Sequence, residues 1–448
     1  MRRTVARAPH LRRAGLVVAI PSLVAIGFAT LLPQSGTAVE SHWCVVCGSL
    51  GGVSAILNIL LFVPLGIGLA IYGFSAKRAI LLMCALSVLI EIAQLVAIPG
   101  RNSTIGDVLT NTLGGALGFA IARNALILLR PTPRTAIALI IGWSTAWFGV
   151  QTATAFGFTP TFPHSQYYGQ IARQLGNREA FSGRVSHASI ADVVVPDTKF
   201  DDSERVRELL LRGAIVTSTF LPPKSAHEIA PIVRVADASE REILVIGQYG
   251  ADIFFGVRTG AAVLHVRPPL FALPDVIADA PSDVRTPATK SLTASAAYSA
   301  REAWMNVQST RSRARRISIT PALGWTMLMP FEWFIEGSGA ESVLSAIWVA
   351  CLLFPIGYWL GCAIRFPRAR EATVRMTAIA TAIASTLLYS GLIVVPHAFG
   401  VSPASPADWL AALVGVLCGC LSAPRQQQAV LAGYTERVRS SRRLTELS

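Results

Sequence analysis

The chain has 448 residues, of which 52% are hydrophobic and only 15% are charged. Soluble globular domains carry about 25% charged residues, so this composition excludes a protein that is soluble throughout, and the mean hydropathy of +0.51 agrees. The net charge of +13 comes from short Arg-rich segments beside apolar runs, the positive-inside pattern of a multi-pass membrane protein. Residues 160–310 hold 15 Lys and Arg against 16 Asp and Glu. We therefore expect membrane lipids, and no nucleic acid, as partners.

Long apolar runs predict the membrane-spanning helices. A span needs about 20 mostly apolar residues. The first run is a 19-residue apolar stretch, longer than the usual 7–15-residue core of a signal peptide, which favours an uncleaved span. Nine candidate segments result: 14–32, 51–73, 79–98, 105–128, 135–157, 318–335, 342–364, 374–398 and 406–422.

Nine crossings would separate the two basic ends of the chain, so one segment must not cross. If segment 318–335 enters the membrane and returns to the same side, the polar middle of the chain lies outside the cell. If 135–157 does not cross, the middle lies inside. The apolar length of 135–157 favours the first alternative, whereas the Arg run at 311–316 and the alignment of an internal repeat favour the second. We expect a cytoplasmic N-terminus and an extracytoplasmic middle segment.

The middle segment has the character of a β-sandwich. Short runs rich in Val, Ile and Phe, separated by turn residues, are typical of antiparallel strands. Residues 274–316, rich in Pro, Ser, Thr and Arg, are expected to form a return linker. The predicted strands are Gly213–Phe220, Ile229–Ala236, Ile243–Gln248, Asp252–Val257 and Ala261–Val266.

An internal repeat relates the two apolar parts. Phe62–Gly66 is echoed by Leu353–Gly357, and the spacing of Asp107, Gly114 and Gly118 is repeated by Asp408, Gly415 and Gly419. Parallel repeats are common in membrane proteins. The expected fold is a mainly α membrane protein, with two related helical bundles and an inserted all-β jelly-roll sandwich. Its expected domains are a bundle (1–158), a sandwich (159–310), a degenerate second bundle (311–424) and a basic cytoplasmic tail (425–448).

Polar and ionisable residues gather in the first apolar part, where they are costly and indicate function by default. Two carboxylates could bracket an arginine there, with amides satisfying the remaining donors and acceptors. Glycines that share a helix face allow close helix packing. A purely structural network is the alternative. The candidate binding residues are Asn58, Glu91, Gln94, Arg101, Asp107 and Asn111, and the candidate packing residues are Pro64, Gly66, Gly114, Gly115 and Gly118.

These residues carry a resemblance. Their order over residues 14–130, from Asn58 and the Phe-x-Pro-Leu-Gly of the second span to the glycines after Asp107, is similar to that of VanZ-like membrane proteins. The resemblance implies a bacterial cell envelope and an association with glycopeptide resistance, without a settled activity. The second copy keeps Asp408 and the glycines. Its positions matching Asn58, Glu91, Gln94, Arg101 and Asn111 hold Val349, Leu392, Val395, Ser402 and Ala412. We expect a scaffold role for it, and the alternative is that Asp408 completes the site of the first copy.

The middle segment resembles a concanavalin A-like or laminin-G-like jelly roll, and such domains often bind glycans. For each candidate glycan contact, a structural role in strand packing or on a solvated face is the favoured interpretation. The acidic run Asp201, Asp202 and Glu204 could hold calcium, but we expect it to be a solvated loop. The candidate contacts are Tyr167, Tyr168, Gln248, Tyr249, Arg258, His265 and Arg267.

The remaining motifs favour no cofactor. The histidines show no zinc-hydrolase spacing, and neither a phosphate-binding loop nor a nucleophile elbow is present. Cys44 and Cys47 form a lone C-x-x-C, which leaves a disulfide and a zinc ligand pair both open. We expect no metal and no cofactor.

Three functions stay open. The leading hypothesis is recognition of a glycan or lipid-linked glycan in the cell envelope, with an effect on antibiotic access. The second is an enzyme that acts on a lipid headgroup, with Glu91 or Asp107 as general acid or base. The third is a transporter that uses the repeat interface.

Overall fold

The computed structural model describes residues 9–33, 42–101, 103–174, 178–222, 226–277, 291–308, 312–364 and 371–423. The predicted basic tail, 425–448, lies outside these residues. By internal contacts the chain divides into two compact units, Met1–Ala138 with Trp359–Thr377 and Ser422–Ser448, and Leu139–Tyr358 with Ala378–Leu421. The domain boundaries drawn from the sequence stay a prediction.

Seven of the described helices are long and apolar enough to cross a membrane, and α12 is a shorter apolar helix. The chain is therefore a multi-pass membrane protein. Helix α5 is a five-residue link between α4 and α6. The seven are α1 (Pro9–Leu31), α2 (Gly51–Tyr72), α3 (Ala76–Ala97), α4 (Ile105–Arg123), α6 (Pro133–Phe158), α9 (Gly339–Ile364) and the segment Thr377–Ala398, which includes most of α10 (Glu371–Tyr389) and all of α11 (Val395–Ala398). The shorter helices are α5 (Ala125–Leu129) and α12 (Pro406–Ser422).

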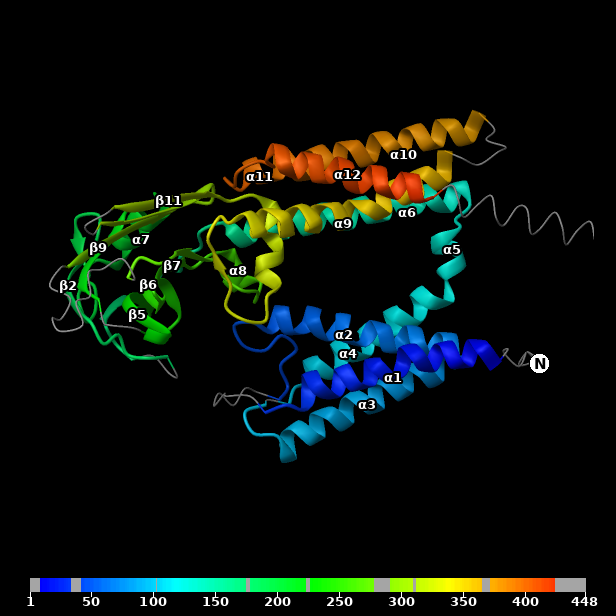
Figure 1. Ribbon diagram of the computed structural model, residues 1–448, viewed down its shortest axis with the longest axis horizontal. Coiled ribbons are helices and arrows are strands. Elements are labelled where there is room, and N and C mark those ends of the chain that lie inside the picture. Colours follow the sequence, from blue (N-terminus) through cyan, green and yellow to red (C-terminus); the bar gives the residue numbers. More distant parts are fainter. Residues whose placement is uncertain are drawn as a thin grey trace, which may run out of the picture. The chain divides into compact units, whose positions relative to one another are not determined.

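The first bundle consists of α1 to α4, which run side by side (Figure 1). The backbones of α2 and α4 are in van der Waals contact. A β-carbon on Gly66 would overlap the carbonyl oxygen of Gly115, and one on Gly118 would overlap that of Val63. Pro64 lies inside α2. Close backbone approach through small residues is a common way for helices to pack in lipid.

The second bundle, of α6, α9, α10 and α12, repeats this crossing (Figure 1). A β-carbon on Gly357 of α9 would overlap the carbonyl oxygen of Val416 of α12, and one on Gly415 would overlap that of Ala350. These positions are the ones that the sequence repeat pairs with Gly66, Gly115, Gly114 and Ile59. The prediction of two related bundles is therefore confirmed at the level of individual backbone contacts.

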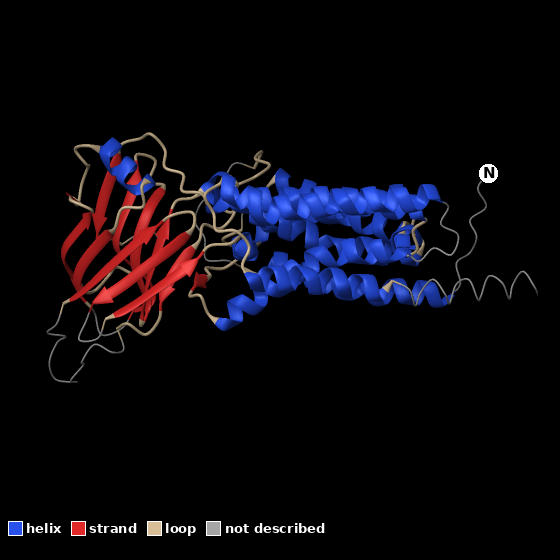
Figure 2. Cartoon of the chain, turned by 90° about the horizontal axis from the view of Figure 1, so that it is seen from above, coloured by secondary structure: helices blue, strands red, loops and turns tan. Residues whose placement is uncertain are grey.

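Between α6 and α9 the chain forms two six-stranded sheets that pack face to face (Figure 2). All neighbouring strands are antiparallel except β8 and β12. The predicted inserted β-sandwich is confirmed. One sheet has the order β1 (Tyr167–Ile171), β5 (Ala226–Asp237), β6 (Glu242–Gly250), β7 (Asp252–Val257), β8 (Leu270–Leu273) and β12 (Phe334–Ile335); the other has β11 (Arg313–Ser318), β10 (Glu302–Gln308), β9 (Leu292–Tyr298), β4 (Val216–Leu221), β2 (Arg184–Ile190) and β3 (Val193–Val194).

Three local predictions were wrong. Ala261–Val266 is not a strand, because α8 (Gly260–Val263) begins there. The expected linker 274–316 contains β9, β10 and most of β11. Three of the buried positions of β9 and β10 are alanines, Ala294, Ala296 and Ala303, which weakens the usual β-branched and aromatic signal of a strand. Segment 318–335 is no apolar helix: its main element is the short 3₁₀-helix η1 (Pro321–Leu328).

The sandwich is joined to the second bundle by buried contacts. The hydroxyl of Tyr298 on β9 donates to the carbonyl oxygen of Phe158, the last residue of α6, at 2.6 Å. On the other side, the backbone N–H of Ser402 donates to the carbonyl of Ile319 at 3.0 Å. Helix η1 is buried between these parts, with Gly324 against Thr154 of α6. The sandwich and most of the second bundle therefore belong to one compact unit.

We predict that Gly66→Ala destabilises the first bundle, because the added methyl group would collide with a backbone atom that no rotamer can move. Overpacking of this kind costs about 1–3 kcal/mol. The matched control is Gly27→Ala in α1, where a β-carbon would have no neighbour within 4 Å. Thermal unfolding of the detergent-solubilised protein should show a lower midpoint for Gly66→Ala alone. Equal midpoints for the two variants would contradict the close crossing.

Candidate functional site

The candidate site lies where α3 ends and α4 begins. The connecting turn contains Pro99 and Gly100, and Gly100 has a φ of +74°, a conformation that glycine adopts without strain. Thr104 is the N-cap of α4, and its hydroxyl accepts from the backbone N–H of Asp107 at 3.2 Å. The same hydroxyl donates to Oδ2 of Asp107 at 2.8 Å. The Thr-x-x-Asp sequence thus fixes both the helix start and the carboxylate.

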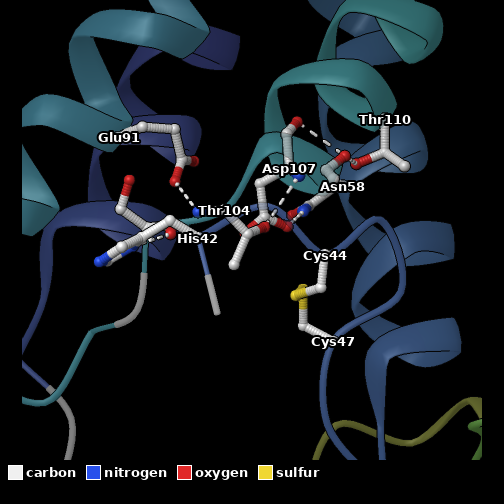
Figure 3. The surroundings of a disulfide bond; sticks show 10 residues. His42, Cys44, Cys47, Asn58, Glu91, Thr104, Asp107 and Thr110 are labelled. Carbon is white, nitrogen blue, oxygen red and sulfur yellow. Dashed lines mark hydrogen bonds between the residues drawn. A yellow bond between two sulfur atoms is a disulfide. The ribbon is translucent and has the colours of Figure 1, made fainter. Parts of the chain in front are cut away.

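Asp107 also links two helices. Its Oδ1 accepts from Nδ2 of Asn58 on α2 at 2.6 Å (Figure 3). The negative charge lies at the N-terminus of α4, where the helix dipole stabilises it. Both oxygens are engaged, yet an ionised carboxylate has about four acceptor positions, so Asp107 keeps acceptor capacity. Asn58 and Asp107 are half-buried.

Glu91 approaches the same point from α3. It is buried, and its Oε2 accepts from the backbone N–H of Thr104 at 2.8 Å. The hydroxyl of Ser103 is a further hydrogen-bond partner of this carboxylate. Glu91 therefore holds the backbone of Thr104 while Asp107 holds its side chain (Figure 3). Two carboxylates from neighbouring helices converge on one threonine.

Arg101 has a different position from the one expected. Its guanidinium donates to the carbonyl oxygens of Ala29, at 2.6 Å, and Leu32, at 3.0 Å, and so caps the C-terminal end of α1. Burial lowers the pKa of Arg101, and the charge of Asp107 partly opposes this effect. The guanidinium thus interacts electrostatically with Asp107 while its hydrogen bonds fix α1.

The two other predicted polar residues form separate links between helices. Nε2 of Gln94 donates to the carbonyl of Thr30 on α1 at 2.9 Å. Nδ2 of Asn111 donates to the hydroxyl of Ser87 on α3, also at 2.9 Å. The predicted set therefore divides: Asn58, Glu91 and Asp107 meet around Thr104, whereas Gln94, Asn111 and Arg101 fasten neighbouring helices.

A disulfide-closed loop covers this end of α4. Cys44 and Cys47 are bonded, which decides between the two alternatives for the C-x-x-C. The carbonyl oxygens of His42 and Cys44 accept from the backbone N–H groups of Ile105 and Gly106, at 3.0 and 3.2 Å. These bonds satisfy first-turn donors that a helix leaves unpaired.

The sequence did not indicate this capping role or the part that Thr104 takes. Thr104 has a recognisable signal in hindsight, since Thr-x-x-Asp at a helix start is close to a capping box. His42 has none: its ring Nδ1 lies 2.8 Å from the carbonyl oxygen of Ser103, 61 residues away, and no local pattern reports such a contact.

Two of the candidate glycan contacts of the sandwich, Tyr167 and Arg267, form hydrogen bonds within the protein. The hydroxyl of Tyr167 donates to the carbonyl of Pro163, and Arg267 donates to the carbonyls of Met329 and Pro330. The acidic residues Asp201, Asp202 and Glu204 are exposed, and Asp202 is the N-cap of α7 (Ser203–Leu211). Tyr249 is exposed, with its ring stacked on Phe334.

The site offers fixed acceptors beside one cation. Carboxylates held in this way suit ligands that donate hydrogen bonds, such as hydroxyl groups, and paired carboxylates also suit acid–base chemistry. Among the described residues, no three His, Cys, Asp or Glu side chains are grouped so that they could hold a metal ion.

We predict that Thr104→Ala lowers the stability of the first bundle by about 1 kcal/mol, since loss of an N-cap costs 0.5–2 kcal/mol. The variant also removes the hydroxyl that orients Asp107. Ser405→Ala is the comparison, because the hydroxyl of Ser405 likewise accepts from the backbone N–H of Asp408 at the start of α12. The backbone N–H of Ser405 donates to Oδ2 of Asp408 and not to an equivalent of Glu91. Thermal unfolding should show both variants destabilised. An unchanged midpoint for Thr104→Ala would rule out the capping role.

Comparison with known proteins gives one family. Residues 8–129 match the family described as VanZ/LLP1. The chain matches no curated protein and no solved structure among those compared. The matched region contains α1 to α4 and the residues that meet around Thr104, namely Asn58, Glu91 and Asp107.

Proposed function

Because residues 8–129 form a VanZ-like domain within a multi-pass membrane protein, we propose that the protein acts in the cell envelope by binding the hydroxyl-rich headgroup of a glycan or lipid-linked glycan. The Thr104 site, formed by Asn58, Glu91, Thr104 and Asp107, would hold that headgroup. The observation that carries the proposal is the convergence of two carboxylates on Thr104 at the end of two membrane helices.

The position of the site along the helices supports a headgroup ligand. Helix α3 has 22 residues, which at 1.5 Å per residue span about 33 Å, close to the thickness of the hydrocarbon core. The residues after its C-terminus and before α4 therefore lie at the height of lipid headgroups. Trp43, in the disulfide loop, is 82% exposed. Tryptophan is enriched at this level because its ring is amphipathic.

The chemistry of the site supports a ligand that donates hydrogen bonds. Glu91 and Asp107 are acceptors when ionised, and the hydrogen bonds from Thr104 and Asn58 fix them before any ligand arrives. A preorganised site loses less entropy on binding than a flexible one. Sugar hydroxyls donate hydrogen bonds readily, so a glycan headgroup fits both the chemistry and the depth.

Two features support an extracytoplasmic position of the site. Disulfides persist in oxidising compartments, and Cys44–Cys47 covers the start of α4. The Arg-rich segment before α1 favours a cytoplasmic N-terminus, which would bring the end of α1 to the outside. The seven long helices and α12 make an even number of crossings over the described residues. With this number the sandwich, between α6 and α9, would also lie outside.

We predict that Asp107→Asn reduces binding of a lipid-linked glycan precursor at least tenfold, because the amide replaces one acceptor oxygen by a donor. The matched control is Asp408→Asn, in the equivalent cap of α12, which should bind as the unaltered protein does. Retention of a radiolabelled lipid-linked precursor by protein in nanodiscs measures the difference. Equal retention by both variants would refute binding at this site.

In cells, we expect the protein to reduce the access of glycopeptide antibiotics to their glycan target. If the protein shields a glycan target, cells expressing Asp107→Ala or Arg101→Ala at normal levels should lose any protection against teicoplanin that the unaltered protein gives. Unchanged susceptibility at equal expression would remove resistance from the proposed function while leaving headgroup binding to the nanodisc assay.

Catalysis at a lipid headgroup is the second candidate, favoured by the burial of Glu91 beside Asp107. A general acid or base must lie within hydrogen-bond reach of the proton it moves. Glu91→Gln separates the two candidates: if the protein is an enzyme, turnover of the precursor is abolished. If the protein only binds, no turnover occurs with either form.

The side of the membrane can be tested at Ser239, which is exposed in the turn between β5 and β6. We predict that Ser239→Cys in intact cells reacts with a membrane-impermeant maleimide. Reaction only after lysis would place the sandwich in the cytoplasm and exclude its contact with envelope glycans. The native disulfide is retained, and peptide mass mapping assigns the label to residue 239.

A further inference from the structure

A row of buried polar side chains lies on one face of α6 in the second bundle. Ser144, Trp147 and Gln151 are three and four residues apart, so they follow one another along the same face of the helix. Each is at most 2% exposed. This row is outside the VanZ-like domain and none of its residues belongs to the Thr104 site.

Each of these side chains has a polar atom without a hydrogen-bond partner among the described residues: Oγ of Ser144, Nε1 of Trp147 and Oε1 of Gln151. A buried polar atom left unsatisfied costs about 1–3 kcal/mol, and in a membrane helix lipid cannot supply the missing partner. Three such atoms in succession indicate that something hydrogen-bonds to them.

The opposite wall of this row is an irregular segment. Residues Ser390–Val394 (η2) form a π-helical turn between α10 and α11, and such turns are frequently found at functional sites. A β-carbon on Gly391 would overlap the ring of Trp147 and would lie 3.3 Å from Cγ of Gln151. The glycine thus lets the π-helical turn contact the polar row directly.

The internal repeat aligns this π-helical turn with the polar part of α3 in the first bundle. Leu392, inside it, occupies the position of Glu91 in the first bundle, and Val395, just after it, that of Gln94. The second bundle has therefore lost the polar residues of its third helix at the point where α6 presents Trp147 and Gln151. In the second bundle the buried polar side chains therefore lie on α6 and not on the third helix.

We propose that Ser144, Trp147 and Gln151 form, with the η2 turn, a second binding site that takes a neutral hydroxyl group, either of water or of a hydroxyl-bearing molecule. The indole N–H of Trp147 only donates and needs an acceptor, whereas Oε1 of Gln151 needs a donor. One hydroxyl group supplies both, and Ser144 can do either. None of the three side chains carries a charge, so the site suits a neutral ligand.

Cysteine labelling tests whether water reaches this site. Ser144→Cys is nearly isosteric, and a thiol reacts with methanethiosulfonate ethylammonium only as the hydrated thiolate. The control is Thr145→Cys, the next residue of α6, whose side chain is exposed on the outer surface of the helix and would face lipid. We expect the thiol at position 144 to react at least tenfold faster in nanodiscs, as followed by peptide mass mapping. Equal or slower reaction would overturn the proposal.

A second variant covers a failure of Ser144→Cys to fold. Gln151→Leu removes the unsatisfied oxygen at similar volume. If the site is occupied, the lost hydrogen bond should lower the unfolding temperature; if the site is dry, removal of an unsatisfied atom should raise it, which would refute the proposal. Slower labelling of Ser144→Cys in glycerol would identify a hydroxyl-bearing organic ligand, whereas an unchanged rate would identify water, and either result supports the site.

Discussion

The close backbone contact between two helices is the constraint on which the membrane part depends. At Gly66 and Gly118 the backbones of α2 and α4 approach so closely that a single methyl group would collide with a carbonyl oxygen. The same crossing recurs between α9 and α12 at Gly357 and Gly415. In lipid, where apolar side chains gain little by meeting one another, dispersion between closely packed surfaces holds helices together. The crossing therefore fixes both bundles.

This crossing also determines where polar groups meet. Because α2 and α4 are held in register, Asn58 reaches Asp107 at 2.6 Å, and the cap residue Thr104 lies between Asp107 and Glu91. In the second bundle the register is kept, but Val349 replaces Asn58, the amide partner of the carboxylate, and Leu392 replaces Glu91. Asp408 then does no more than cap α12 through Ser405. The same helix arrangement thus holds an acidic site around Thr104 in the first bundle and an uncharged row of polar side chains, Ser144, Trp147 and Gln151, in the second.

Much of this architecture was predictable from the sequence, for identifiable reasons. Apolar length predicted the spanning helices, and the spacing of Asp107, Gly114 and Gly118 exposed the duplication. Strand β7 was found because Ile253, Phe254 and Phe255 are bulky and contiguous. Strand β9 was missed because two of its four buried positions are alanines, Ala294 and Ala296, and none is Val or Ile. The bonds from Arg101 to α1 could not be predicted, since carbonyl acceptors leave no trace in side-chain identity, and the capping by His42 depends on a contact distant in sequence.

The point at which the sandwich enters the chain has a consequence of its own. It occupies the connection between the first and second helices of its bundle, residues 159–338, just as the disulfide loop occupies that connection, residues 32–50, in the first bundle. The same junction has thus accepted a hairpin-sized loop in one copy and an entire folded module in the other, with the helix crossing unchanged. Protein engineers therefore have a grafting point: a reporter or binding module inserted between α1 and α2 would be displayed beside the acidic site, without any change to the glycines that hold the helices together.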